Sequence, residues 1–131
     1  METQFPQWLK SLGQRRRDMP PVDRGLPFSH LIRYSGDVTT WQIVGTVKAS
    51  PDAATELATF TISAPTYDAD TGLTAWVATL TPEQTLALGG ANFEGVTQRF
   101  FDFVISESEG ANPRRLMAGI FPISGFVTEL S

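Results

Sequence analysis

Short apolar runs separated by turn residues make up most of the chain after Gly25. The runs are rich in Val, Ile, Thr and aromatic residues, and Pro, Gly, Asp and Ser stand between them. This pattern is typical of antiparallel strands. We expect strands at Phe28 to Tyr34, Trp41 to Lys48, Leu57 to Ser63, Leu73 to Leu80, Arg99 to Ser106 and Arg115 to Ile123, with Phe126 to Thr128 as an extension of the last. Their spacing predicts two packed sheets, and hence an all-β antiparallel sandwich.

The stretch RFFDFVIS, from Arg99 to Ser106, predicts a strand in the middle of a sheet. Side chains alternate between the faces of a strand. One face therefore carries Phe101, Phe103 and Ile105, and the other carries Phe100, Asp102 and Val104. Both faces are mostly apolar, as in a strand that is covered on both sides. The polar SESEGANPRR that follows indicates a hairpin into RLMAGIFPI, where Pro122 marks the end of the partner strand or a sheet edge.

The same alternation predicts the core. Ile43 and Val47 share a face with Trp41 in the second strand, and Ile62 shares one with Phe60 in the third. Aromatic side chains dominate the burial energetics of small cores. We therefore expect the core to contain Trp41, Phe60, Phe101 and Phe103.

One short helix is predicted between the strands, at TPEQTLAL. Thr81 can cap its first amides, Pro82 fits the first helical position, and Gln84 completes a capping box. Gly89 and Gly90 then end the helix.

The first 25 residues differ in character from the rest and predict a mostly irregular N-terminal arm, followed by one sandwich domain over residues 26–131. The arm contains Pro20, Pro21 and an arginine run, and it has too few apolar residues for a core of its own. A short amphipathic helix from Pro6 to Leu12, ended by Gly13, is expected but is too short to be stable alone. The residues expected to bind a partner are Phe5, Trp8, Leu9, Leu12, Arg15, Arg16 and Arg17.

Charge and composition exclude several classes of function. The arm has five basic and three acidic residues, a net charge of +2, which leaves −6 for the remainder of a chain whose total is −4. An acidic body repels nucleic acid, so we expect no nucleic-acid role. The chain has no cysteine and hence no disulfide, thiolate metal site or cysteine nucleophile. No apolar run is long enough to span a membrane, and the N-terminal residues lack the apolar segment of a secretory signal.

The polar residues that could carry chemistry have simpler explanations. His30 has no second histidine or cysteine with which to form a metal site or a catalytic triad. Asp68 and Asp70 lack the remaining ligands of a calcium loop, and with Gly72 they fit a turn between strands. Asp102 lies in an apolar strand without a partner carboxylate, which favours a structural role as a hydrogen-bond acceptor. We therefore expect no enzymatic activity, no metal and no cofactor.

The order of these motifs resembles the immunoglobulin-like domain of tailed-bacteriophage structural proteins, including the N-terminal domain of baseplate upper proteins. The resemblance covers about Arg24 to Leu130, and its motifs are RGLPF, DVTTW, LTPEQTLAL, FFDFVI, LMAGIFPI and VTE. Asp102 matches the aspartate of an aromatic-Asp-apolar strand, and Gly119 matches the glycine of the final strand. Val127 and Thr128 match its closing pair. The loop GGANFEGVTQ departs from the family, which has a short glycine-aromatic turn there.

This resemblance implies an immunoglobulin-like sandwich that acts as a virion structural protein. Such domains serve in tails and baseplates, necks, fibres and capsid decoration. The expected partners are other virion proteins, with several copies or a homo-oligomer in the particle, and the arm and loops make the contacts. The alternative is a small carbohydrate- or host-receptor-binding module of a tail fibre, with aromatic residues such as Trp76 or Phe93 at its binding surface.

Overall fold

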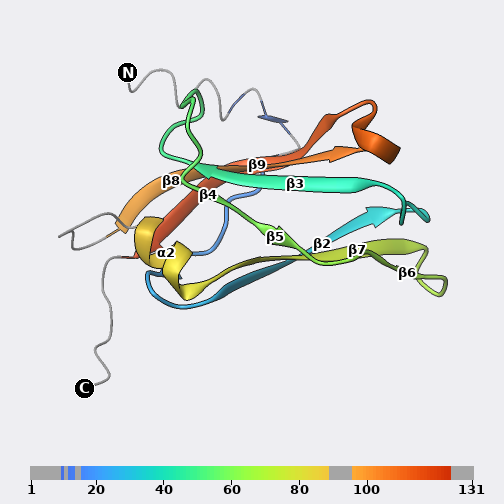
Figure 1. Cartoon of the computed structure of the whole chain (residues 1–131), viewed down its shortest axis with the longest axis horizontal. Helices are drawn as coiled ribbons and strands as arrows, with labels where there is room; N and C mark the ends of the chain where they lie inside the picture. The colour runs from blue at the N-terminus through green and yellow to red at the C-terminus, as the bar shows by residue number, and fades with distance from the viewer. Residues whose placement is uncertain (1–9, 11, 14–15, 89–95, 125–131) are drawn as a thin grey trace.

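The computed structural model of the chain describes residues 10, 12–13, 16–88 and 96–124. Two β-sheets face each other and enclose the core between them (Figure 1). The larger sheet has the strand order β1-β9-β8-β3-β4. Its strands are β1 (Val22–Asp23), β9 (Arg114–Ser124), β8 (Val96–Ser106), β3 (Gln42–Lys48) and β4 (Ala58–Thr59).

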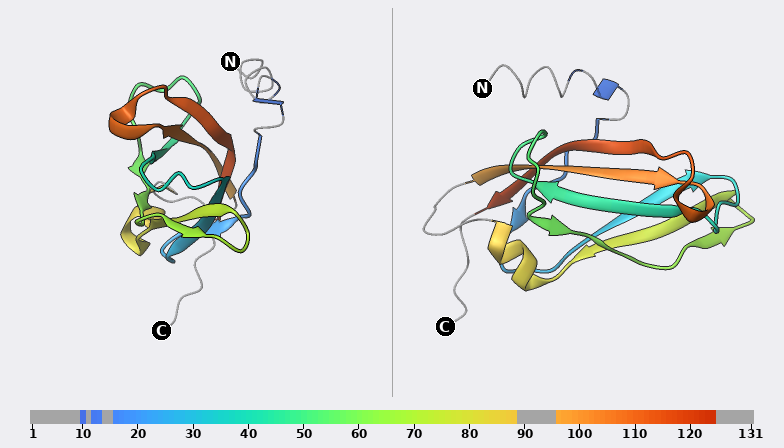
Figure 2. Two further views of the ribbon diagram at one scale, coloured as in Figure 1. Left: turned by 90° about the vertical axis from the view of Figure 1, so that its right-hand side faces the viewer. Right: turned by 45° about the horizontal axis from the view of Figure 1, so that its top comes forward.

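The smaller sheet has the order β2-β7-β5, and β6 also pairs with β7. Its strands are β2 (Phe28–Ser35), β7 (Leu73–Leu80), β5 (Thr61–Ile62) and β6 (Thr66–Asp68). The pairs formed by these strands are antiparallel, whereas β1 runs parallel to β9. Grouping β3, β8 and β9 in one sheet and β2, β7 and β5 in the other is the arrangement of an immunoglobulin-like sandwich. The predicted fold class is confirmed, and Figure 2 shows the two layers from the end of the sandwich.

One predicted strand, Leu57 to Ser63, is divided between the two sheets. Its first part is β4, which pairs with β3, and its second part is β5, which pairs with β7. Phe60 stands between the two parts, is buried, and donates its N–H to the carbonyl of Gly45 at 2.9 Å. The chain therefore changes sheets at a residue whose side chain stays in the core. The other five predicted strands are confirmed to within three residues at each end. The extension predicted at Phe126 to Thr128 lies outside the described residues.

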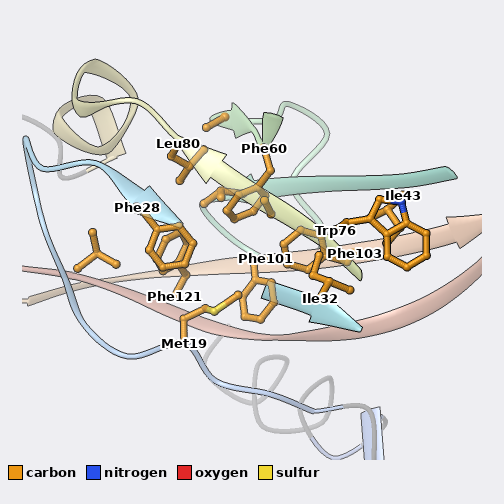
Figure 3. Packing of buried hydrophobic residues seen from close by; sticks show 14 of the residues in the cluster. Met19, Phe28, Ile32, Ile43, Phe60, Trp76, Leu80, Phe101, Phe103 and Phe121 are labelled. Carbon is orange, nitrogen blue, oxygen red and sulfur yellow. The ribbon is translucent and has the colours of Figure 1, made fainter. Parts of the chain in front are cut away.

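Aromatic side chains from both sheets meet in the core (Figure 3). The ring of Phe103 lies 4.8 Å from that of Phe60, and the ring of Phe28 lies 5.0 Å from that of Phe121. The predicted core is confirmed for Phe60, Phe101 and Phe103. Trp41 is only partly buried and packs at the margin of the core.

Strand β8 lies in the middle of the larger sheet, as predicted, between β9 and β3. In its register with β3, Phe103 is opposite Gly45. A Cβ atom on Gly45 would collide with the ring of Phe103. The absence of a side chain at this position therefore makes room for the ring of Phe103.

The helix α2 (Pro82–Leu88) has the predicted capping box. The hydroxyl of Thr81 accepts the N–H of Gln84 at 3.2 Å, and the side-chain oxygen of Gln84 accepts the N–H of Thr81 at 2.8 Å. At the other end, Arg99 Nε donates to the carbonyl of Leu88 at 2.8 Å, which satisfies one of the terminal carbonyls. The predicted stop at residues 89 and 90 lies outside the described residues.

The N-terminal segment is the main correction to the predicted organisation. Residues 16–24 do not stand apart from the sandwich as an arm: they run alongside β9 and end in strand β1. Met19 and Val22 are buried in the core. These two residues are three positions apart, so they lack the alternation of a strand, and the two adjacent prolines between them also argue against one. The boundary expected at Gly25 therefore falls inside the folded unit.

We predict that Phe103→Ala lowers the free energy of unfolding by about 3–5 kcal/mol, because removing a fully buried ring leaves a cavity. Chemical denaturation monitored by tryptophan fluorescence would measure the loss. Val44→Ala is the control, because Val44 lies in the same sheet but is 54% exposed, and it should change stability by less than about 1 kcal/mol. Equal losses for the two variants would contradict the assignment of the core.

Candidate protein-interaction site

The structure describes only some of the predicted partner-binding residues, and these differ in exposure. Phe5, Trp8, Leu9 and Arg15 lie outside the described residues, as does most of the helix expected from Pro6 to Leu12. Leu12 is 2% exposed, so its side chain is already covered within the chain. Arg16 and Arg17 are exposed at the edge of the larger sheet.

Backbone hydrogen bonds attach the segment of residues 16–24 to β9. The N–H of Arg17 donates to the carbonyl of Ala118 at 2.9 Å, and that of Met19 donates to Ile120 at 2.9 Å. Farther along, the N–H of Arg24 donates to Ser124 at 3.0 Å. The segment therefore extends the sheet by one parallel edge strand along the last part of β9.

A side chain supplies one of the acceptors in this edge strand. Asp18 Oδ1 accepts the N–H of Ile120 at 3.1 Å. The same carboxylate receives both Nε and Nη2 of Arg16, at 3.2 and 2.9 Å. The hydrogen bonds from Arg16 and then from Ile120 hold the pKa of Asp18 below its ordinary value, and the bond to Asp18 raises the pKa of Arg16. Arg16 is therefore engaged within the chain, where its carboxylate partner fixes it against β9.

Gly119 allows the segment to approach β9 this closely. A Cβ atom at Gly119 would lie 2.5 Å from the carbonyl oxygen of Arg17 and 2.7 Å from Asp18 Oδ1. Both distances are far shorter than any real contact of a Cβ atom. The signal for this contact is present in the sequence as a glycine inside a strand, which often marks a close backbone approach.

Prolines limit the hydrogen bonding at this edge. Pro20 and Pro21 have no N–H to donate. The N–H of Ile120 points toward the segment, so the nitrogen of Pro122, two residues farther along β9, faces the same side. Pro122 does not end β9, which continues to Ser124. Because Pro20 and Pro21 lie in the edge segment itself, this edge resists the addition of another strand.

The structural role predicted for Asp102 matches its contacts. Its Oδ1 accepts the hydroxyl of Thr46 at 3.1 Å, and Arg115 Nη2 lies 3.6 Å from its Oδ2. The three side chains come from adjacent strands of the larger sheet and line a hollow of about 70 Å³ with Lys48. Asp102 is therefore neutralised by its neighbours, and the hollow is small for an organic substrate.

The other polar candidates are also accounted for by local contacts. His30 packs 6.3 Å from the ring of Phe103, and burial lowers its pKa. Asp68 Oδ1 accepts the N–H of Asp70 at 2.9 Å, and Gly72 has a φ of 72°, so the predicted turn is confirmed. Among the described residues, no group of three or more His, Cys, Asp or Glu side chains is placed to hold a metal ion.

The aromatic surface of the carbohydrate-binding alternative is not found at Trp76. This side chain is 2% exposed and lies in the core, because its strand position faces the other sheet. Phe93, the second aromatic residue of that alternative, lies outside the described residues. Trp76 therefore cannot contact a glycan in the folded protein.

Comparisons with known proteins add little to this description. No protein-family model matches the chain, and no curated protein matches it. Among solved structures, it is similar to AggA, the major subunit of aggregative adherence fimbriae type I from Escherichia coli. The similarity has a TM-score of 0.38 and 7% sequence identity, and it covers 82% of this chain and 91% of that one. A similarity this distant carries no conclusion about function. No helix among the described residues is long and apolar enough to cross a membrane.

We predict that Asp18→Asn weakens docking of the segment in a pH-dependent way. The folded-state pKa of Asp18 is lowered, so its contribution to stability is fully present above the ordinary aspartate pKa and is lost as the pH falls through the folded value. Thermal unfolding of the wild type and the variant should therefore differ at about pH 7 and converge toward about pH 2. A difference that stays constant with pH would show that the charge of Asp18 is not involved.

We also predict that Gly119→Ala costs about 1–3 kcal/mol, because the added methyl group overpacks the contact with Arg17 and Asp18. Hydrogen exchange should show faster exchange for the amides of Arg17, Met19 and Ile120. The amides that pair β2 with β7 serve as the internal control and should change little. Equal loss of protection in both regions would contradict a local effect at this edge.

Proposed function

We propose that this protein is a non-enzymatic structural protein of a bacteriophage virion. It acts as an adaptor or decoration protein of the tail and baseplate, the neck or the capsid, and it is located in the virion after assembly in the host cytoplasm. Support comes from the order of motifs from RGLPF to VTE in the sequence and from the immunoglobulin-like sandwich that the described residues form. A sandwich of this kind is a rigid base on which loops and termini are displayed.

The proposed mode of action rests on one observation, the docking of residues 16–24 on β9. Because this segment is fixed to the sheet by Asp18 and the backbone, the chain that precedes Arg16 is tethered at the edge of the larger sheet. We therefore assign the partner contact to residues 1–15, which is shorter than the arm expected from the sequence. Trp8 is the proposed anchor, since aromatic and arginine side chains tend to dominate interfaces.

Charge supports an acidic partner surface. Residues 1–15 contain Lys10 and Arg15 against Glu2, a net charge of +1, and the remainder of the chain carries −5. A basic segment next to an acidic body favours binding to the acidic surface of a neighbouring subunit, including another copy of this chain. Since Arg16 is bound to Asp18, Arg15 is the arginine of the run assigned to that contact.

The polar contacts support a function without catalysis or a cofactor. Asp102 is hydrogen-bonded to Thr46 and lies beside Arg115, and His30 packs on an aromatic ring. Neither residue is joined to a second titratable group in an arrangement that could transfer a proton to a substrate. The proposed partners are therefore proteins, with no nucleic acid or membrane.

We predict that deleting residues 1–15 leaves a folded protein that no longer enters the particle. Deleting residues 1–23 is the matched control: it should also lower the melting temperature, because it removes Met19 and Val22 from the core. Thermal unfolding measures the first property, and copurification of a tagged chain with assembled particles measures the second. Normal incorporation of the shorter truncation would overturn the assignment of the contact to residues 1–15.

A further inference from the structure

The outer face of the smaller sheet is a patch of three strands. In Figure 1 it is the face of β2, β7 and β6 that is turned away from the larger sheet. The pairing places Arg33 of β2 and Thr66 of β6 on either side of Ala75. In the next row, Ser35 and Asp68 lie on either side of Leu73.

The centre of this patch is apolar and exposed. Leu31 and Val77 are paired neighbours on β2 and β7, and they are 47% and 36% exposed. Leu73 and Ala75 continue the apolar strip along β7 and are half-buried. A hollow of about 370 Å³ lies over the strip, lined by Leu31, Arg33, Thr66, Asp68, Leu73 and Ala75.

Opposite charges border the strip on opposite sides. Arg33 lies on the β2 side and Asp68 on the β6 side, and within the described residues neither forms an ion pair. On the larger sheet, by contrast, Asp102 is paired with Arg115 inside the chain. The patch thus has one positive and one negative margin, which form no ion pair with each other across the strip.

We propose that this patch binds the same patch of a second copy of the chain, in a dimer with a two-fold axis parallel to β7. Rotation about that axis places β2 of one copy over β6 of the other, because the two strands flank β7. Arg33 then lies over Thr66 of the second copy, since both residues pair with Ala75. Asp68 is two residues farther along the same strand, about 7 Å away. An arginine side chain can span that distance.

The two-fold axis makes this contact occur twice. Each Arg33 reaches the Asp68 of the other copy, so both margins are neutralised together, as in an isologous interface. The apolar residues of β7 lie along the axis and pack against those of the second copy. Sheets that pack face to face with strands nearly aligned are a common arrangement.

The size of the patch sets the strength of the dimer. β2 and β7 each have four outward residues and β6 has two. With strands about 4.8 Å apart, these ten positions cover roughly 300 Å² per copy. The total of roughly 600 Å² is below the ~1,200 Å² at which stable interfaces begin. The dimer is therefore weak in dilute solution, and it gains strength where copies are already held together in a particle. This inference extends the proposed function, but its test uses the isolated protein, so either can fail without the other.

A crosslinking experiment tests the geometry. Because the chain has no native cysteine, only the introduced thiol reacts with the crosslinker. Ala75→Cys places one thiol near the axis in each copy, and a short bismaleimide should join them at high protein concentration. Val44→Cys is the control: it is exposed on the larger sheet and should give little crosslinked dimer. Equal yields from the two variants would overturn the proposed interface.

Charge reversal tests the pairing independently. Arg33→Glu makes both margins acidic and Asp68→Lys makes both basic, so each variant alone should lose the concentration-dependent self-association of the wild type in sedimentation. Mixing the two variants should restore association, because the faces are then complementary. Thermal unfolding verifies that each variant is folded, since Asp68 also accepts the amide of Asp70. Unchanged self-association of Arg33→Glu, or no association in the mixture of folded variants, would overturn the proposal.

Discussion

The ring of Phe103 sets the spacing between the two sheets, on which the sandwich depends. It lies against Gly45 in its own sheet, 4.8 Å from Phe60 at the crossing between sheets, and 6.3 Å from His30 in the opposite sheet. A single ring therefore contacts both layers and the segment that connects them. Because protein interiors are packed as densely as organic crystals, a change in its volume would be transmitted to all three. Because the contacts of Phe103 hold the two sheets against each other, they also fix the outward faces and the edges of the sheets relative to one another.

Much of the fold could be predicted because its signals are local. Alternating apolar residues identified β8 as a central strand, and the spacing of Thr81 and Gln84 identified the helix cap. The division of Leu57 to Ser63 between sheets could not be predicted, since Phe60 has the same alternation whether or not the chain changes sheets there. Strand β1 was missed because it has only two residues and directly follows Pro20 and Pro21, and because its partner strand β9 lies about a hundred residues away in the sequence.

The candidate site was predictable in composition but not in geometry. The sequence drew attention to the arginines and to Gly119 separately, and only the structure shows that Gly119 makes room for Asp18 and that Asp18 binds Arg16. The patch on the smaller sheet was missed for a related reason. Arg33 and Asp68 are far apart in the sequence and become opposite margins of one surface only through their common neighbour, β7.

The parallel pairing of the first and last described strands has a mechanical consequence. The bonds from Arg17, Met19 and Arg24 to β9 lie side by side along one direction. A pull on the chain at Arg16, opposed by a pull at Ser124, would load these bonds in shear, so that they share the force and must break together. An antiparallel hairpin pulled at its two ends would instead open one bond at a time. The edge that holds the N-terminal segment is thus arranged to carry tension between the two ends of the domain.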